Sequence, residues 1–294
     1  MKTIIVRNRL LPLPLIAAFG LMMTPVLQAQ FTYQTNVGTI YISRYGGPGG
    51  DVTIPDTING LPVVGLDLGA FYNCTNLTAV TIADSITYIG DFVFYGCSNL
   101  ASVTIPNKVN TIGNNAFDSC VRLTNLTLGT NLATIGMNAF QSCYNLTSVI
   151  IPSSVTSLAS LAFDCGAKLT SVYFEGNPPS VDTLDLPAFF GDDNVTIYYL
   201  PGTMGWTNTF PGLPTALWKP QVLTTAASFR VLTNQFGINV TWASGMTVVV
   251  EASTDLSHPT WFTVTTNVLS SGTFSFGDPQ WTNYPSRFYR VRSP

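Results

Sequence analysis

The sequence predicts a β-rich chain in two parts, a solenoid of stacked coils with a parallel sheet and a small antiparallel β-sandwich after it. Two observations predict the solenoid, because a phenylalanine recurs every 23 residues and a leucine recurs with the same period. Two independent columns with one period exclude coincidence, and such a period is typical of stacked repeats. The sandwich is predicted because the period is absent from residue 220 onward, where short strand-like segments alternate with turn residues.

The columns that define the period lie between residues 71 and 169. They are Phe71, Phe94, Phe117, Phe140 and Phe163, and Leu77, Leu100, Leu123, Leu146 and Leu169. Two more apolar columns stand two residues apart in every unit, so both point to one side of a strand. They are Val80, Val103, Leu126, Val149 and Val172, and Ile82, Ile105, Leu128, Ile151 and Phe174. These inward columns predict one strand of the parallel sheet in each unit.

The rest of the unit predicts a turn and a return. A further apolar column is Ile89, Ile112, Ile135, Leu158 and Val181. In the first three units it is followed by Gly90, Gly113 and Gly136, where we expect a turn that needs the backbone freedom of glycine. The segment that carries the phenylalanine is predicted to be short and helical or irregular. Because one unit cannot bury its own apolar side, we expect stability to come from the stacking of neighbours.

Composition shifts divide the chain into five parts. Residues 1–29 combine a basic start, an apolar stretch and the small residue Ala29, which predicts a cleaved export signal, so we expect no membrane-spanning segment in the mature chain. Residues 30–70 are predicted to be an N-terminal cap with an irregular first repeat, 71–182 the regular repeats, 183–219 a C-terminal cap and 220–294 the sandwich, with six strands between residues 228 and 291. Atypical ends stop an open solenoid from stacking on a second copy, so we expect a monomer.

The repeat units resemble a known family. Two segments are similar to the BspA-like leucine-rich repeat of bacterial surface proteins. They are residues 112–120, IGNNAFDSC, and residues 146–152, LTSVIIP. The resemblance spans roughly residues 52–182 and implies a leucine-rich-repeat solenoid, adhesion, and the binding of host or matrix proteins. It implies no catalytic residues. The tail module resembles a fibronectin type III or immunoglobulin-like sandwich at the level of fold only.

Charge and cysteine patterns narrow the function classes. Only 9% of the residues are charged and the formal net charge is −3, so the chain lacks the basic field that nucleic acid binding requires.

Cys74, Cys97, Cys120 and Cys143 share the period, and Cys165 departs from it by one residue. We expect buried free thiols rather than a zinc site, although an adjacent pair could oxidise.

Catalytic and metal-binding patterns are weak. His258 is the only histidine, and the two glutamates, Glu175 and Glu251, lie in different modules. One acidic cluster consists of Asp182, Asp185, Asp192 and Asp193. The cluster lacks the spacing of a calcium loop, so we interpret it as a hydrated turn. We therefore predict a protein that is not an enzyme and that carries no metal and no cofactor.

The predicted binding site is the exposed face of the parallel sheet, which alternates with the buried columns. Its residues are Thr81, Thr104, Thr127, Ile150 and Tyr173, flanked by Asn125, Ser148 and Ser171. The face is neutral and hydroxyl-rich, and it becomes apolar toward its C-terminal end. The alternative is a solvated sheet made of good strand formers. As exposed anchors, Ile150 and Tyr173 would contribute most to binding.

Two functions follow from this reasoning. The first is a secreted or surface-exposed adhesion protein that engages an extracellular protein through the sheet face. The alternative is an accessory protein that binds polysaccharide through the tail module. There Trp261, Trp281, or the pair Arg290 and Arg292 on one face of the last strand, would contact the glycan.

Overall fold

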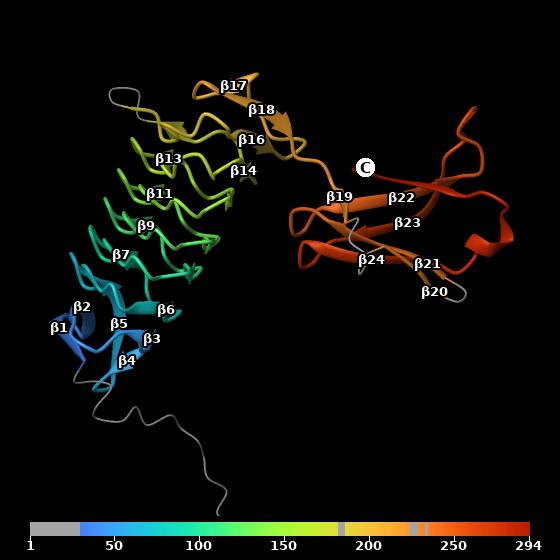
Figure 1. Ribbon diagram of the computed structural model, residues 1–294. Helices are drawn as coiled ribbons and strands as arrows, with labels where there is room; N and C mark the ends of the chain where they lie inside the picture. Colours follow the sequence, from blue (N-terminus) through green and yellow to red (C-terminus); the bar gives the residue numbers. More distant parts are fainter. Residues whose placement is uncertain (1–29, 182–185, 224–228, 233–234) are drawn as a thin grey trace, which may run out of the picture.

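Each 23-residue unit folds into one coil with two short strands. The computed structural model describes residues 30–181, 186–223, 229–232 and 235–294, so the predicted leader lies outside the described residues. One central coil contains β8 (Ser102–Thr104) and β9 (Thr111–Ile112), joined by turns. Successive coils place equivalent strands side by side in parallel, which gives the solenoid two sheets (Figure 1). The predicted fold class is confirmed.

The first sheet, called here the front sheet, is the predicted parallel sheet. It consists of two ladders, β3-β6-β8-β10 and β12-β14-β16-β18, with β17 antiparallel to β18. Their other bounds are β3 (Gly50–Thr53), β6 (Leu77–Thr81), β10 (Asn125–Thr127), β12 (Ser148–Ile151), β14 (Ser171–Phe174), β16 (Thr196–Tyr199), β17 (Thr209–Phe210) and β18 (Leu213–Leu217). Residues one period apart face each other, as Ile150 faces Tyr173, so every column of the sequence becomes a row across the sheet.

The second sheet, the back sheet, contains the column from Ile89 to Val181. Most of its strands have only two residues, because the chain turns on both sides of them. The strands are β1 (Phe31–Asn36), β2 (Thr39–Tyr45), β5 (Leu61–Leu66), β7 (Tyr88–Ile89), β9, β11 (Thr134–Ile135), β13 (Ser157–Leu158) and β15 (Ser180–Val181), with β4 (Thr57–Ile58) beside β5. At the N-terminal end β1 pairs antiparallel with β2 and so covers the first coil.

The core of the solenoid is a ladder of phenylalanine rings. From Phe71 to Phe163 the rings are fully buried, and neighbouring centroids lie 4.9, 5.0, 5.2 and 5.0 Å apart. This separation follows from the strand spacing of about 4.8 Å in a sheet. The ladder continues past the regular repeats, because Phe189 stacks on Phe163 at 5.6 Å although three extra residues separate them. The segment predicted as the C-terminal cap therefore extends the same core.

The return that carries the phenylalanine consists of turns. Two positions in each coil adopt the left-handed region, for example Asn115 at φ 54° and Ser119 at φ 62°. The sequence suggested that Gly90, Gly113 and Gly136 supply the backbone freedom that a turn needs. This explanation is wrong, because none of the three has a positive φ. A Cβ on Gly136 would lie 2.7 Å from the backbone of the preceding coil. These glycines allow close coil stacking.

The tail module contains two antiparallel sheets, as predicted. One sheet has β21 (Gln235–Thr241) at its centre, with β24 (Thr273–Asp278) on one side and both β19 (Gln221–Leu223) and β20 (Phe229–Leu232) on the other. The second sheet has the order β23 (Phe262–Val268), β22 (Thr247–Ser253), β25 (Phe288–Arg292). Strands β20 to β25 correspond to the six predicted strands, and β19 was missed.

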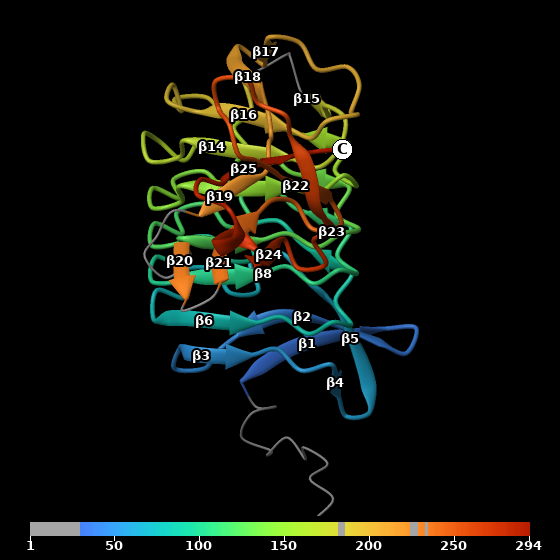
Figure 2. The ribbon, with the colours of Figure 1, turned by 90° about the vertical axis from the view of Figure 1, so that its right-hand side faces the viewer.

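The module lies on the same side of the solenoid as the front sheet (Figures 1 and 2). Within the described residues, the one helical element is the short 3-10 turn η1 (Trp281–Asn283), which precedes β25. The described part of the chain contains no helix with the length and apolar character needed to cross a membrane.

Candidate binding face

The front sheet brings all eight predicted residues onto one surface. Thr81, Thr104 and Thr127 are exposed in a row, and Ile150 follows with 46% of its surface exposed. The alternating residues Val80, Val103 and Val149 are buried and Leu126 is half-buried, because successive side chains of a strand point to opposite sides of the sheet. Asn125 and Ser148 are exposed beside the row, and Ser171 is half-buried.

Two residues extend this row beyond the predicted set. Thr53 pairs with Thr81 at the N-terminal end, and Tyr198 pairs with Tyr173 at the other end. Thr53 had a signal in the sequence, because Thr53-Ile54-Pro55 repeats the pattern of Thr104-Ile105-Pro106. Tyr198 lacked one, since it stands 25 residues after Tyr173 and so falls outside the period. We call the row from Thr53 to Ile150 the open row.

Tyr173 is not the exposed anchor that the sequence suggested. Its side chain is half-buried, and its ring packs against Tyr198 at 4.9 Å and against Trp218 at 4.8 Å. The physical reason is that the C-terminal strands and the tail module cover this end of the sheet. The apolar C-terminal end that the sequence predicted for this face is therefore a junction with the rest of the chain.

Trp218 is the centre of this junction. It is 7% exposed, and its carbonyl accepts a hydrogen bond of 3.0 Å from the indole N–H of Trp242 in the module. Leu200 and Trp218 share one apolar cluster with Ile238, Val240 and other core residues of the module. The module is therefore attached to the C-terminal end of the front sheet by a packed core, and it stands in front of the sheet in Figure 2.

The cysteine column is buried and free, as predicted. Cys97, Cys120, Cys143 and Cys165 are buried and Cys74 is half-buried; none forms a disulfide. Each buried thiol donates to the phenylalanine carbonyl of the preceding coil, over 3.2 to 3.4 Å. Burial raises the pKa of Cys97 to about 12 and that of the other three well above the ordinary value. Such thiols are poor nucleophiles because little thiolate forms.

Comparison with known proteins agrees with this geometry. Residues 66–196 match the BspA type leucine rich repeat region with six copies. A crystal structure of a leucine-rich-repeat protein from T. pallidum is 31% identical, with a TM-score of 0.52, over 63% of this chain and 89% of that one. The chain belongs to the BspA-type leucine-rich-repeat family.

Other solved members of the leucine-rich-repeat class are less similar to this BspA-type protein. A protein from Bacteroides capillosus is 26% identical over 50% of this chain and 95% of its own, with a TM-score of 0.35. A leucine-rich cell surface protein from Faecalibacterium prausnitzii is 20% identical over 64% of this chain and 75% of its own, with a TM-score of 0.24. No curated protein matches the chain.

The acidic cluster of this BspA-type protein is only partly within the described residues, since Asp182 and Asp185 lie outside them. Asp193 is exposed, whereas Asp192 is fully buried and accepts a hydrogen bond of 3.2 Å from the backbone N–H of Cys165. Among the described residues no group of three or more potential metal ligands is present. Asp192 therefore closes the turn around Cys165, which stands two residues after Phe163, whereas Cys143 stands three residues after Phe140.

Burial of Asp192 predicts a pH-dependent stability. Desolvation raises the pKa of its carboxyl to about 7, so the folded chain favours the protonated acid. Because the folded pKa exceeds the unfolded one, stability is highest below about pH 4 for this group and falls as the pH rises toward 7. Between pH 5 and pH 7 we expect the free energy of unfolding of the wild type to fall by about 2 kcal/mol, measured by urea denaturation. Asp192→Asn should abolish this fall. The exposed Asp193→Asn serves as control, and an unchanged pH profile in Asp192→Asn would contradict the assignment.

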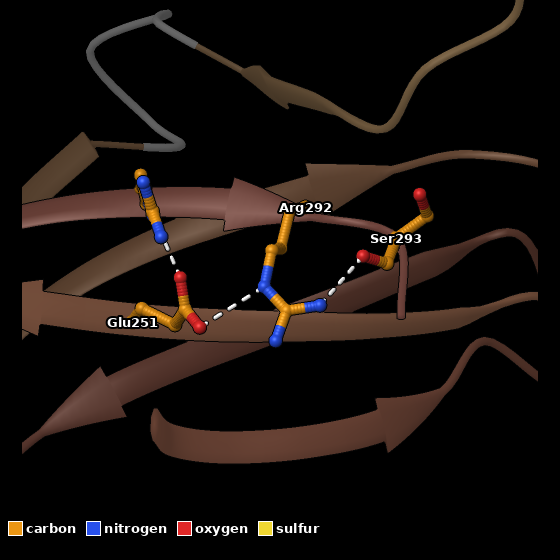
Figure 3. A network of polar contacts seen from close by, with 4 residues as sticks. Glu251, Arg292 and Ser293 are labelled. Atoms are coloured by element: carbon orange, nitrogen blue, oxygen red, sulfur yellow. Dashed lines mark hydrogen bonds and ion pairs between the residues drawn. The ribbon is translucent and has the colours of Figure 1, made fainter. Parts of the chain in front are cut away.

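A polar network occupies the outer face of the tail module (Figure 3). Glu251 accepts hydrogen bonds from Arg290 at 2.7 Å and Arg292 at 3.0 Å, which confirms that both arginines share one face. The hydrogen bond from Arg290 is the main cause that lowers the pKa of Glu251. The guanidinium of Arg290 also lies 4.4 Å from the ring centre of Trp261. One ring face of Trp261 is therefore already covered.

Proposed function

We propose that this chain is an exported, non-catalytic binding protein of the bacterial surface that holds another protein on the open row of its front sheet. The observation that carries the proposal is the open row itself, a line of exposed hydroxyl groups that ends at the exposed side chain of Ile150. Hydroxyl groups both donate and accept hydrogen bonds, so they fit a protein partner without a charge to desolvate. Family membership supports the proposal, because repeat proteins commonly bind through such extended surfaces.

The position of the tail module favours the Ile150 end of the open row as the centre of binding. Beyond Ile150 the sheet is covered at Tyr173 and Tyr198, so a partner on the open row would meet the module beside its apolar end. Apolar residues at the centre of an interface, surrounded by polar groups, contribute most of the binding energy. Ile150 is then the anchor, and the threonines fix the orientation of the partner.

A charge placed at the anchor tests the proposal. Purified protein that begins at residue 30 is used to capture protein from native extracellular material, and the captured protein is then titrated. We expect Ile150→Arg to weaken its binding by about 30-fold, which corresponds to the loss of one central contact of about 2 kcal/mol. The matched control is Tyr88→Arg, which places the same charge on an exposed strand residue of the back sheet and should bind like the wild type.

Two results would contradict the proposal. Equal binding by the wild type and both variants would move the site away from the front sheet. Capture that survives protease treatment of the extracellular material, and is lost after digestion of its polysaccharides, would favour a glycan ligand instead.

A further inference from the structure

β25 is one of the edge strands of the tail module. β25 pairs antiparallel with β22 from Ser253↔Phe288 to Val249↔Arg292, and no described strand pairs with its other side. In an antiparallel edge strand, alternate residues point their N–H and C=O groups away from the partner strand. Among the residues that the structure describes, the outer side of β25 is therefore a line of backbone donors and acceptors that another strand could use.

An apolar groove of about 270 Å³ runs beside this edge. It is lined by Val222 of β19, by Phe236 and Ile238 of β21, and by residues 287–289 and 291 at β25, of which Tyr289 and Val291 point inward. At one end of the groove Asp278 pairs with Arg287 at 2.8 Å and accepts the hydroxyl of Tyr289 at 2.8 Å. These polar groups have partners within the module, so what remains for a ligand is an apolar wall.

The outer face of the same edge is cationic. Arg290 and Arg292 share the single carboxylate of Glu251, and their side chains are 46% and 43% exposed. Two guanidinium groups and one carboxylate leave one unit of positive charge beside the open strand (Figure 3). A strand added here would direct alternate residues into the groove and the others toward the arginines.

We propose that the open edge of β25 accepts an extended segment of another polypeptide, in which apolar residues alternate with acidic ones. Backbone hydrogen bonds would give the affinity, the groove would take the apolar side chains, and the arginines would select the acidic ones. A second copy of β25 is a poorer occupant, because antiparallel pairing about its midpoint sets Arg290 opposite Arg290, and like charges facing each other are destabilising.

The proposal is tested with a labelled synthetic peptide of about seven residues, in which valine alternates with glutamate. Anisotropy measurements on protein from residue 30 to 294 should show saturable binding. A peptide with lysine in place of glutamate should bind about tenfold more weakly or less, and a peptide with proline at the glutamate positions should not bind. Val222→Trp, which fills the groove and leaves β25 unchanged, should remove binding of the glutamate peptide.

A second measurement keeps the test independent of any folding defect in the variant. The glutamate peptide is joined to Pro294 through a flexible glycine-serine linker, and we expect the melting temperature of the module to rise by about 5 °C. Equal binding of the glutamate and lysine peptides would overturn the proposed selectivity. The absence of both binding and thermal stabilisation would overturn the site, and a dimer in light scattering that dissociates on adding the peptide would assign the edge to a second copy.

Discussion

Replacement of Phe117 by alanine is expected to lower the free energy of unfolding by about 3–5 kcal/mol. The ring is fully buried and stacks on Phe94 at 5.0 Å and on Phe140 at 5.2 Å, so its removal leaves a cavity between two coils. In a linear stack each coil contacts only its neighbours, so no distant part of the chain can fill the cavity. Urea denaturation followed by circular dichroism measures the loss.

The matched control is Tyr144→Ala, which removes an aromatic ring that is 54% exposed from the next coil. We expect this variant to change the free energy of unfolding by less than about 1 kcal/mol. If the two variants lost the same stability, the phenylalanine ladder would not be the core of the solenoid.

Replacement of Trp218 by alanine is expected to cost about 3 kcal/mol and to separate the unfolding of the module from that of the solenoid. The indole is 7% exposed and packs on Tyr173, and the backbone carbonyl of this residue bonds to Trp242. Because the described contacts between the two parts centre on this residue, its loss should turn one calorimetric transition into two. Differential scanning calorimetry of the wild type and the variant provides the measurement.

Met204→Ala controls for the C-terminal region, because Met204 lies between β16 and β17 with 74% of its surface exposed. It should leave both the number of transitions and their temperatures unchanged. A single sharp transition in Trp218→Ala at the wild-type temperature would show that the junction does not couple the two parts.

The repeat could be predicted from the sequence because the contacts that bury each residue recur in every 23-residue unit. Phe117, Leu123 and Val103 are buried as their columns indicated, since a coil repeats the environment of the coil before it. The back sheet was harder to predict, because a strand such as Thr111–Ile112 is too short to produce an alternating pattern. The glycine column was found, but its close approach to the neighbouring coil depends on stacking that no single unit reveals.

The candidate site was predicted less completely, because some of its residues are covered by segments that lie far from them in the sequence. Thr104, Thr127 and Ile150 lie on the predicted face because the alternation within a strand places them there. The burial of Tyr173 depends on Tyr198 and Trp218, which stand 25 and 45 residues later and outside the period. Contacts between a repeat and a non-repeating segment leave no periodic trace in the sequence.

The thiol of each buried cysteine and the ring of each phenylalanine make the same contacts from one coil to the next. Insertion or loss of one 23-residue unit therefore joins surfaces that already fit, and neither the first coil nor the junction with the module needs to change. The reach between the two ends of the molecule can vary in steps of one coil, about 5 Å each. Duplication of the gene segment for one unit can thus lengthen the solenoid, while the N-terminal coil and the junction with the tail module stay unchanged.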